Sequence, residues 1–210
     1  MGGRGSSSGV GRYGGGGVSP NDIISTSDML SNMSKSPQTV SEFLGVSRDV
    51  WNEYSENIGG AFVFAEMKPG TSAIAYYDGS NIGLNTRYAN ASRMNKAYDD
   101  CVSDGFHPKR GNKTGAEAVA AHEIGHALTD AAAKKMGVYS IDEAATRIVT
   151  QARKSTSHRG VVQMAAKISR YATHSNAEAV AEAFADVYCN GSKAAAESRA
   201  IVATLNGYIK

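Results

Sequence analysis

The stretch Ala120–Leu128 reads AAHEIGHAL, which is an H-E-x-x-H motif within a long alanine-rich run. On an α-helix, residues four positions apart lie about one turn apart on the same face. His122 and His126 can therefore offer two imidazole nitrogens to one metal ion. Glu123 lies beside the first histidine, where its carboxylate can act as a general base on a water molecule. The motif predicts a catalytic zinc site, and the alternative is an ordinary helix with two histidines and a surface glutamate.

The residues on both sides of the motif favour a buried helix. Thr114 is a suitable N-cap, and Gly137 is a suitable stop at the other end. Small and apolar residues flank the histidines, as a buried active-site helix requires. Gly125 leaves room for another backbone to come close to the site.

Composition indicates one domain with a sizeable core. The chain has 210 residues and a formal net charge of +2 from 22 basic and 20 acidic residues. This balance gives no argument for nucleic acid as a partner, and no apolar run is long enough for a membrane span. No secretory signal peptide is visible, so we expect a cytoplasmic protein, or a virion-associated one if a phage encodes it. Cys101 and Cys189 fit neither a disulfide framework nor a C-x-x-C metal site, and we expect two buried or partly buried thiols in a reducing compartment.

The N-terminal residues differ in composition from the rest. Residues 1–36 are rich in Gly and Ser and have few apolar side chains. Such a segment cannot bury enough surface to offset the entropy of ordering it, so we expect a disordered tail. Residues 37–210 are expected to form the domain, with a sheet-containing half at about 60–137 and a helical half at about 138–210. The Gly-rich opening resembles those of phage and prophage proteins in composition alone.

A small sheet is predicted before the motif. Residues 61–67, 72–77 and 81–85 each have the composition of a short strand, and Asp78-Gly79 is a strong hairpin signal. An edge of this sheet can hold an extended peptide by strand addition. The alternative is a sheet that only supports the motif helix.

The other predicted elements are helices. They cover residues 39–46, 88–103, 114–137, a stretch capped by Ser140, and residues 161–169, 177–189 and 194–208. Trp51 is expected to pack in the core, while His107 and His158 fall in polar loops and are expected at the surface. The predicted fold class is α+β: a small mixed or antiparallel sheet packed on the active-site helix, followed by an all-helical half.

The motif supplies only two of the three protein ligands that a catalytic zinc ion takes. The extended form H-E-x-x-H-x-x-G-x-x-H is excluded, because Thr129 and Ala132 stand where it has glycine and histidine. The third ligand must therefore come from elsewhere in the chain.

Acidic residues on two later helices compete for this role. Glu143 follows the motif, but it also fits a capping box. Glu178, Glu182 and Asp186 share one face of a later helix, where like charges repel unless a cation lies nearby. Glu178 also stands in a Ser-x-x-Glu cap with Ser175. We favour the later helix over Glu143.

At these residues the chain resembles the catalytic domain of anthrax lethal factor and its relatives, which include the proline-proline endopeptidases of clostridia. That family has a tyrosine seven residues before its third zinc ligand and a glutamate four residues after it. Tyr171, Glu178 and Glu182 match this spacing. The resemblance covers about residues 60–208, and its specific parts are the two short motifs. It implies a zincin-like fold for residues 37–210, one Zn²⁺ ion, and hydrolysis of a peptide or protein substrate.

The resemblance also implies a role for each residue. The zinc ligands would be His122, His126 and Glu178. Glu123 would be the general base, and Tyr171 would donate a hydrogen bond to the oxyanion or leaving group. Apart from the resemblance, His174 is an alternative donor if Tyr171 does not serve. Glu182 would hold a zinc-bound imidazole in its tautomer.

The chain also departs from the family, so the resemblance implies the reaction chemistry rather than a particular substrate. Ala179-Val180 is smaller than the usual pair between the two glutamates, and no specificity loop of the proline-specific members is evident. Phage-encoded zinc peptidases that cut repressors share an H-E-x-x-H and a later acidic helix, and they stay open as relatives. Two rivals to an endopeptidase also stay open: a phage structural or accessory protein with a non-catalytic zinc site, and a peptide-binding module.

Overall fold

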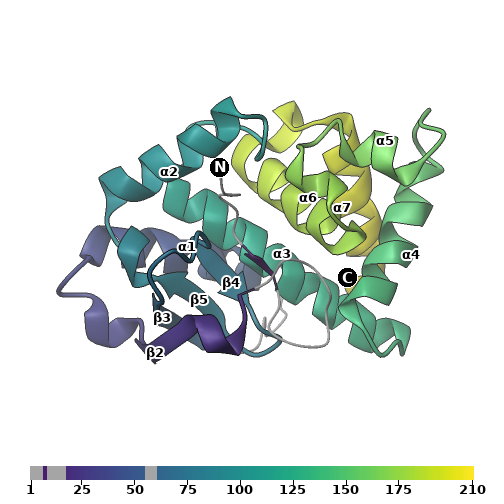
Figure 1. Cartoon of the computed structure of the whole chain (residues 1–210). Coiled ribbons are helices and arrows are strands. Elements are labelled where there is room, and N and C mark those ends of the chain that lie inside the picture. Colours follow the sequence, from purple (N-terminus) through teal and green to yellow (C-terminus); the bar gives the residue numbers. More distant parts are fainter. Residues whose placement is uncertain (1–6, 9–17, 55–60) are drawn as a thin grey trace.

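A computed structural model of the protein describes residues 7–8, 18–54 and 61–210 (Figure 1). A sheet-bearing half and a helical half share one long helix, α3 (Gly115–Met136). This helix contacts α1, α2 and strand β4 of the first half, and α4, α6 and α7 of the second. The architecture confirms the predicted α+β class, with a mixed sheet before the motif helix and helices after it.

The sheet has five strands in the order β1-β4-β5-β3-β2. Their bounds are Ser7–Ser8 for β1, Ile23–Asp28 for β2, Phe62–Met67 for β3, Ala75–Tyr77 for β4 and Ile82–Asn85 for β5. β4 and β5 form the predicted hairpin, with Gly79 at a positive φ of 91° in its turn. β3 runs parallel to β5 and β1 parallel to β4, whereas β2 is antiparallel to β3.

Helices make up most of the remaining described chain. Their bounds are Pro37–Tyr54 for α1, Ala91–Ser103 for α2, Ile141–Arg153 for α4, Val161–Ala165 for α5, Asn176–Asn190 for α6 and Ala196–Ile209 for α7. Short 3₁₀ turns are η1 (Pro20–Asp22), η2 (Leu30–Asn32), η3 (Thr86–Tyr88), η4 (Tyr171–Thr173) and η5 (Gly191–Lys193). No helix in the described part of the chain is long and apolar enough to cross a membrane.

Alternating side chains of the sheet contribute to two separate apolar clusters, as the twofold period of a strand requires. Phe64, Tyr77 and Leu84 belong to the main core, which they share with residues of α1 and α3. Tyr76 belongs to a smaller cluster that also contains Val18. The main core therefore fixes the sheet against the helix that carries the motif.

Part of the predicted disordered tail is ordered. Residues 18–36 contain β2, η1 and η2, and the tail prediction is wrong for them. β2 is held by backbone pairing with β3, while five of its six residues are exposed, so it lacks the apolar alternation that marks a half-buried strand. Residues 1–6 and 9–17 of the predicted tail lie outside the described residues.

The expectation for Trp51 is also wrong. α1 continues beyond the predicted end at residue 46, and its buried face includes Val46, Val50 and Tyr54. Trp51 falls beside that face and is 50 % exposed. The expectation for the thiols is confirmed, because Cys101 and Cys189 are both buried and neither forms a disulfide within the described chain.

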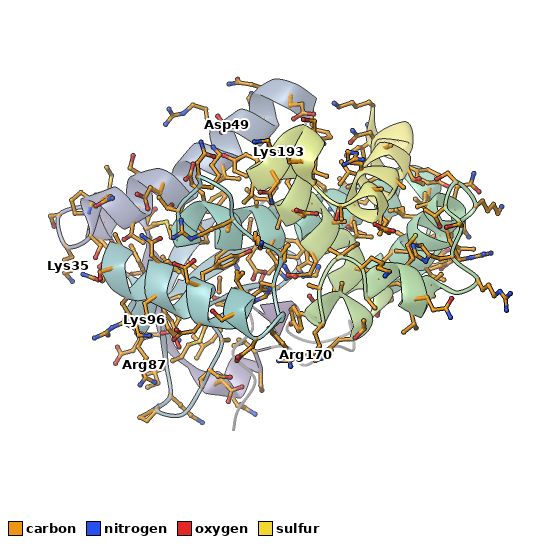
Figure 2. All side chains as sticks on the ribbon, turned by 90° about the horizontal axis from the view of Figure 1, so that it is seen from above. Lys35, Asp49, Arg87, Lys96, Arg170 and Lys193 are labelled. Carbon is orange, nitrogen blue, oxygen red and sulfur yellow. The ribbon has the colours of Figure 1, made fainter. Side chains whose placement is uncertain are left out.

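Charged side chains of both signs lie on the outside of both halves. Figure 2 labels six exposed ones: Lys35, Asp49, Arg87, Lys96, Arg170 and Lys193. This mixture of positive and negative side chains agrees with the small net charge of the chain.

Candidate metal centre

Helix α3 is defined at both ends by the residues that its sequence predicts. The Thr114 side chain accepts a hydrogen bond from the backbone N–H of Glu117, and the Glu117 carboxylate accepts one from the N–H of Thr114. This reciprocal capping box satisfies N–H groups that the helix itself leaves unpaired. Gly137 ends the helix in the left-handed conformation, at φ 65°. His122 and His126 therefore lie in the middle of a well-capped helix.

A close approach of α6 to α3 brings the later acidic residues to the histidines. A Cβ atom on Gly125 would lie 2.8 Å from Cα of Ala181 and 3.2 Å from Cβ of Phe184. Only glycine leaves enough room for α6 at this point. The expectation that Gly125 allows a close backbone approach is confirmed, and the approaching backbone belongs to the helix that carries Glu178 and Glu182.

Three donor atoms from the two helices converge. His122 Nε2 lies 3.2 Å from His126 Nε2 and 3.2 Å from Glu178 Oε2, and His126 Nε2 lies 3.5 Å from the same oxygen. Zinc bonds of about 2.0–2.2 Å to nitrogen and oxygen place two ligand atoms of a tetrahedron about 3.3–3.6 Å apart. These residues therefore fit a tetrahedral metal ion. His122, Glu123 and His126 form a buried group able to hold one.

Charges within this buried cluster stabilise one another. Burial alone lowers the pKa of His122, but hydrogen bonds to Glu178 and Glu182 raise it well above its ordinary value. Burial alone raises the pKa of the Glu178 carboxyl, but the charge of His126 and hydrogen bonds to both histidines bring it well below its usual range. Burial lowers the pKa of His126. The ring nitrogens of the two histidines and the Glu178 carboxylate face one another, and this arrangement favours a cation, either a proton or a metal ion, between them.

Glu123 differs from the other acids of the cluster. Its side chain is 0 % exposed, and neither carboxylate oxygen has a hydrogen-bond partner among the described residues. Burial raises its pKa to about 8, an effect that His122 opposes and Glu178 reinforces. A buried carboxylate without a protein partner has both oxygens available to accept a proton.

The remaining residues that the resemblance named lie around the histidines. Glu182 Oε1 lies 2.7 Å from His122 Nδ1, on the far side of the ring from the donor triangle. The Tyr171 hydroxyl donates to Glu178 Oε1 at 3.1 Å, and its ring stacks on His122 with centroids 5.8 Å apart. Burial, together with the charge of Glu178, raises the pKa of Tyr171 far above its ordinary value, so the phenol keeps its proton. Ser175 does cap α6 by accepting a hydrogen bond from the backbone N–H of Glu178, while the Glu178 carboxylate lies against the two histidines.

Other candidates lie apart from this group. Glu143 is exposed, and its carboxylate accepts a hydrogen bond from Arg147. Asp186 is buried, but it accepts hydrogen bonds from the Ser198 hydroxyl and other groups that anchor α7. His174 is exposed, with its ring 5.0 Å from that of Tyr171.

His107 is the residue that the sequence analysis missed. It was expected at the surface but is 4 % exposed, and its Nδ1 lies 2.8 Å from Glu182 Oε1. Its ring stacks on Tyr98 with a centroid distance of 5.4 Å and an interplanar angle of 7°. The only local signal was its place between Phe106 and Pro108 in an otherwise polar loop. His158 was also expected at the surface, but it is partly buried and pairs with Glu197.

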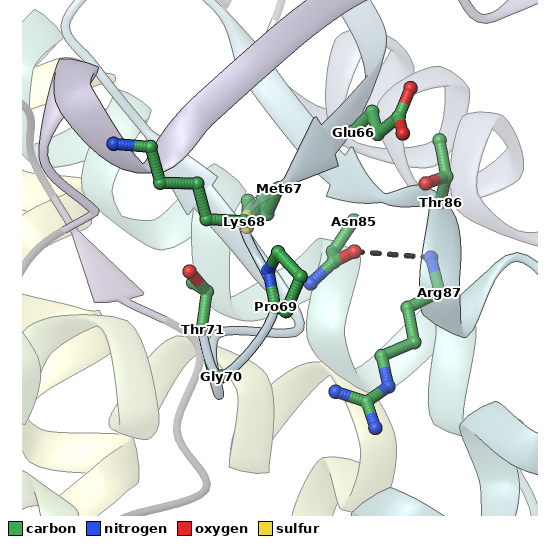
Figure 3. A pocket seen from close by; sticks show the side chains of 9 residues that line it. All are labelled: Glu66, Met67, Lys68, Pro69, Gly70, Thr71, Asn85, Thr86 and Arg87. Atoms are coloured by element: carbon green, nitrogen blue, oxygen red, sulfur yellow. Dashed lines mark hydrogen bonds between the residues drawn. The ribbon is translucent and has the colours of Figure 1, made fainter.

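Two open pockets lie outside the donor cluster. One, of about 450 Å³, lies at the ends of β3 and β5, where Asn85 accepts a hydrogen bond from the N–H of Arg87 (Figure 3). The other, of about 260 Å³, lies beside the turn that carries Tyr171 and is lined in part by Val162 and Ala172. Neither pocket is lined by the histidines of the motif.

No protein-family model, curated protein or solved structure matches this chain. What is established about the site is therefore its geometry: a buried His122-Glu123-His126 cluster on a helix, with Glu178 beside the two histidines.

Proposed function

We propose that this chain is a zinc-dependent endopeptidase. The observation that carries the proposal is the triangle of His122 Nε2, His126 Nε2 and Glu178 Oε2, with sides of 3.2 to 3.5 Å. It stands next to Glu123, whose buried oxygens have no partner in the described chain. A catalytic zinc site needs this combination of three protein ligands and a free base.

The zinc ligands would be His122, His126 and Glu178. A zinc ion held there supplies Lewis-acid chemistry, because it polarises a peptide carbonyl and lowers the pKa of water towards neutrality. Glu123 accepts the proton of the attacking water and returns it to the leaving amine. Tyr171 exchanges its hydrogen bond to Glu178 for one to the developing oxyanion. Glu182 holds the His122 ring by its Nδ1–H, so that Nε2 keeps a lone pair for the metal.

The resemblance to the lethal factor family supports the same roles. The family spacing of Tyr171, Glu178 and Glu182 is accompanied here by contacts of all three with the motif histidines or with one another.

The rival functions make different use of Glu123. A structural zinc ion takes four protein ligands and has no need of a base, whereas this cluster pairs three donor residues with an unpartnered carboxylate. A peptide-binding module would keep its affinity for peptide after chelation of the metal.

The first experiment measures zinc per chain in wild type and in Glu178→Ala. We expect about one zinc ion per wild-type chain and a large loss in the variant, because two ligands hold zinc much less tightly than three. Glu143→Ala is the matched control and should keep its zinc. Wild-type protein that takes up no zinc after reconstitution would rule out the metallopeptidase.

The second experiment screens a peptide library with wild type and Glu123→Gln. The amide cannot accept the proton, so cleavage should fall by about 10²–10⁴-fold while zinc stays bound. Cleavage by Glu123→Gln at the wild-type rate would show that Glu123 is not the general base. A zinc-loaded wild type that cuts nothing would favour the accessory-protein rival.

A further inference from the structure

The Glu182 carboxylate receives hydrogen bonds from three different segments of the chain. Its Oε1 lies 2.7 Å from His122 Nδ1 on α3 and 2.8 Å from His107 Nδ1 on the loop after α2. Its Oε2 accepts a hydrogen bond of 2.7 Å from the Ser169 hydroxyl. Glu182 itself lies on α6 and is 1 % exposed. A carboxylate only accepts, so both histidines must present an Nδ1–H to it.

His107 is held in place independently of the carboxylate. Its ring lies flat on Tyr98 of α2, and the Tyr98 hydroxyl donates to the carbonyl of Pro108. The edge of its ring contacts Phe106 and Tyr171, at centroid distances of 5.1 and 5.5 Å. An imidazole fixed on several sides can in turn fix the flexible glutamate side chain that it contacts.

The same network reaches the turn that carries Tyr171. Ser169, which donates to Glu182, also accepts a hydrogen bond from the N–H of Ala172. The N–H groups of Arg170 and Tyr171 donate to the carbonyls of Gly105 and Phe106, at 2.9 and 3.1 Å. The loop that carries His107 and the turn that carries Tyr171 are therefore paired backbone to backbone.

We propose that His107 is a positioning residue for the zinc site, which fixes the Glu182 carboxylate and through it the His122 ring. Through Ser169 and the paired backbone, it also sets the position of Tyr171. This inference rests on the proposed zinc site. It assigns His107 no contact with the substrate or with the reacting atoms.

The test is zinc affinity, measured by competition with a coloured chelator at fixed pH. His107→Phe keeps an aromatic ring on Tyr98 but removes the donor to Glu182. We expect its dissociation constant for zinc to rise about 10–100-fold, the usual effect of removing a group that orients a metal ligand. His107→Asn places an amide N–H near the position of Nδ1, and it should recover most of the loss. The melting temperature of each metal-free variant, measured in parallel, separates lost affinity from lost stability.

His158→Phe is the matched control. His158 Nε2 lies 2.7 Å from Glu197 Oε1, so this variant also removes a histidine–glutamate pair, but one that joins the loop after α4 to α7. Its zinc affinity should stay within about twofold of wild type. Equal affinity of wild type and His107→Phe would overturn the proposal. Equal weakening in His107→Phe and His107→Asn would also overturn it, since the donor would then be irrelevant.

Wild type alone gives a second measurement if His107→Phe does not fold. The ¹⁵N-resolved NMR signals of the imidazole rings should show a slowly exchanging proton on Nδ1 of His107, because that atom donates to a buried carboxylate. An Nδ1 without a proton would overturn the proposal. Zinc binding without peptide cleavage would count against the endopeptidase. The role of His107 would then be decided by the zinc affinities of its variants alone. Wild type without zinc would refute both.

Discussion

At the scale of single residues, the centre balances like charges with histidines. Glu178 and Glu182 lie one helical turn apart, where two carboxylates repel. His122 contacts both of them, through Nε2 and Nδ1, and His107 contacts Glu182 as well. Although burial alone raises the pKa of Glu182, the charge of His107 and hydrogen bonds from both histidines lower it to about 2. Two buried carboxylates can therefore stay ionised next to each other, ready to orient and bind a cation.

Burial also raises the pKa of Cys189, and there the neighbouring charges of Lys113 and Arg110 offset it only in part. Burial, reinforced by Glu117, raises the pKa of its thiol to about 12. At pH 8, about one thiol in ten thousand is then ionised, roughly a thousandfold less than for a thiol of ordinary pKa. We expect iodoacetamide to label Cys189 very slowly in the native protein and rapidly in guanidinium. Mass spectrometry of the labelled peptides measures this, and rapid native labelling of Cys189 would contradict the raised pKa.

At the scale of elements, local signals were sufficient for the helix that carries the motif. Thr114 and Gly137 set its ends through the hydrogen bonds of their own neighbours, so the sequence predicts them. β2 and His107 could not be found in this way. β2 exists because β3 offers it a free edge, and His107 is buried because α2, α6 and the turn at Tyr171 meet around it. Such contacts depend on residues far away in the sequence, and no local pattern encodes them.

The contact between α3 and α6 can be tested at Gly125. A methyl group there would lie 2.8 Å from the backbone of Ala181, which cannot rotate aside as a side chain can. We expect Gly125→Ala to push the helices apart, to lower the free energy of unfolding by about 1–3 kcal/mol, and to reduce zinc content because Glu178 moves with α6. Denaturant unfolding and elemental analysis measure the two effects.

The control for this substitution is Gly207→Ala on α7. Apart from its own turn of helix, no atom of the described residues lies within 4 Å of the position of its Cβ, so the added methyl group meets open space. There, the better helix propensity of alanine should raise stability by up to about 1 kcal/mol and leave zinc content unchanged. If both variants were as stable as wild type and bound as much zinc, the close approach at Gly125 would not be needed for the site.

At the scale of the whole molecule, the candidate metal centre joins elements that are far apart in the sequence. The two histidines belong to α3, which both halves share, and Glu178 belongs to α6 in the helical half. A metal ion bound by all three residues would hold α3 and α6 together. Because the unfolded chain has no such preformed site, zinc binding should stabilise the folded protein.

Thermal unfolding measures this stabilisation. Free zinc at about a thousand times its dissociation constant adds about 4 kcal/mol to the free energy of unfolding, which raises the Tm of a chain of this size by about 8–16 °C. Glu178→Ala should lose most of this increase. Magnesium, which prefers six oxygen ligands, should leave the Tm of wild type unchanged and serves as the control. An equal Tm for zinc-loaded and chelator-treated wild type would mean that the ion does not bridge α3 and α6, because a ligand that binds only the folded protein must raise its Tm.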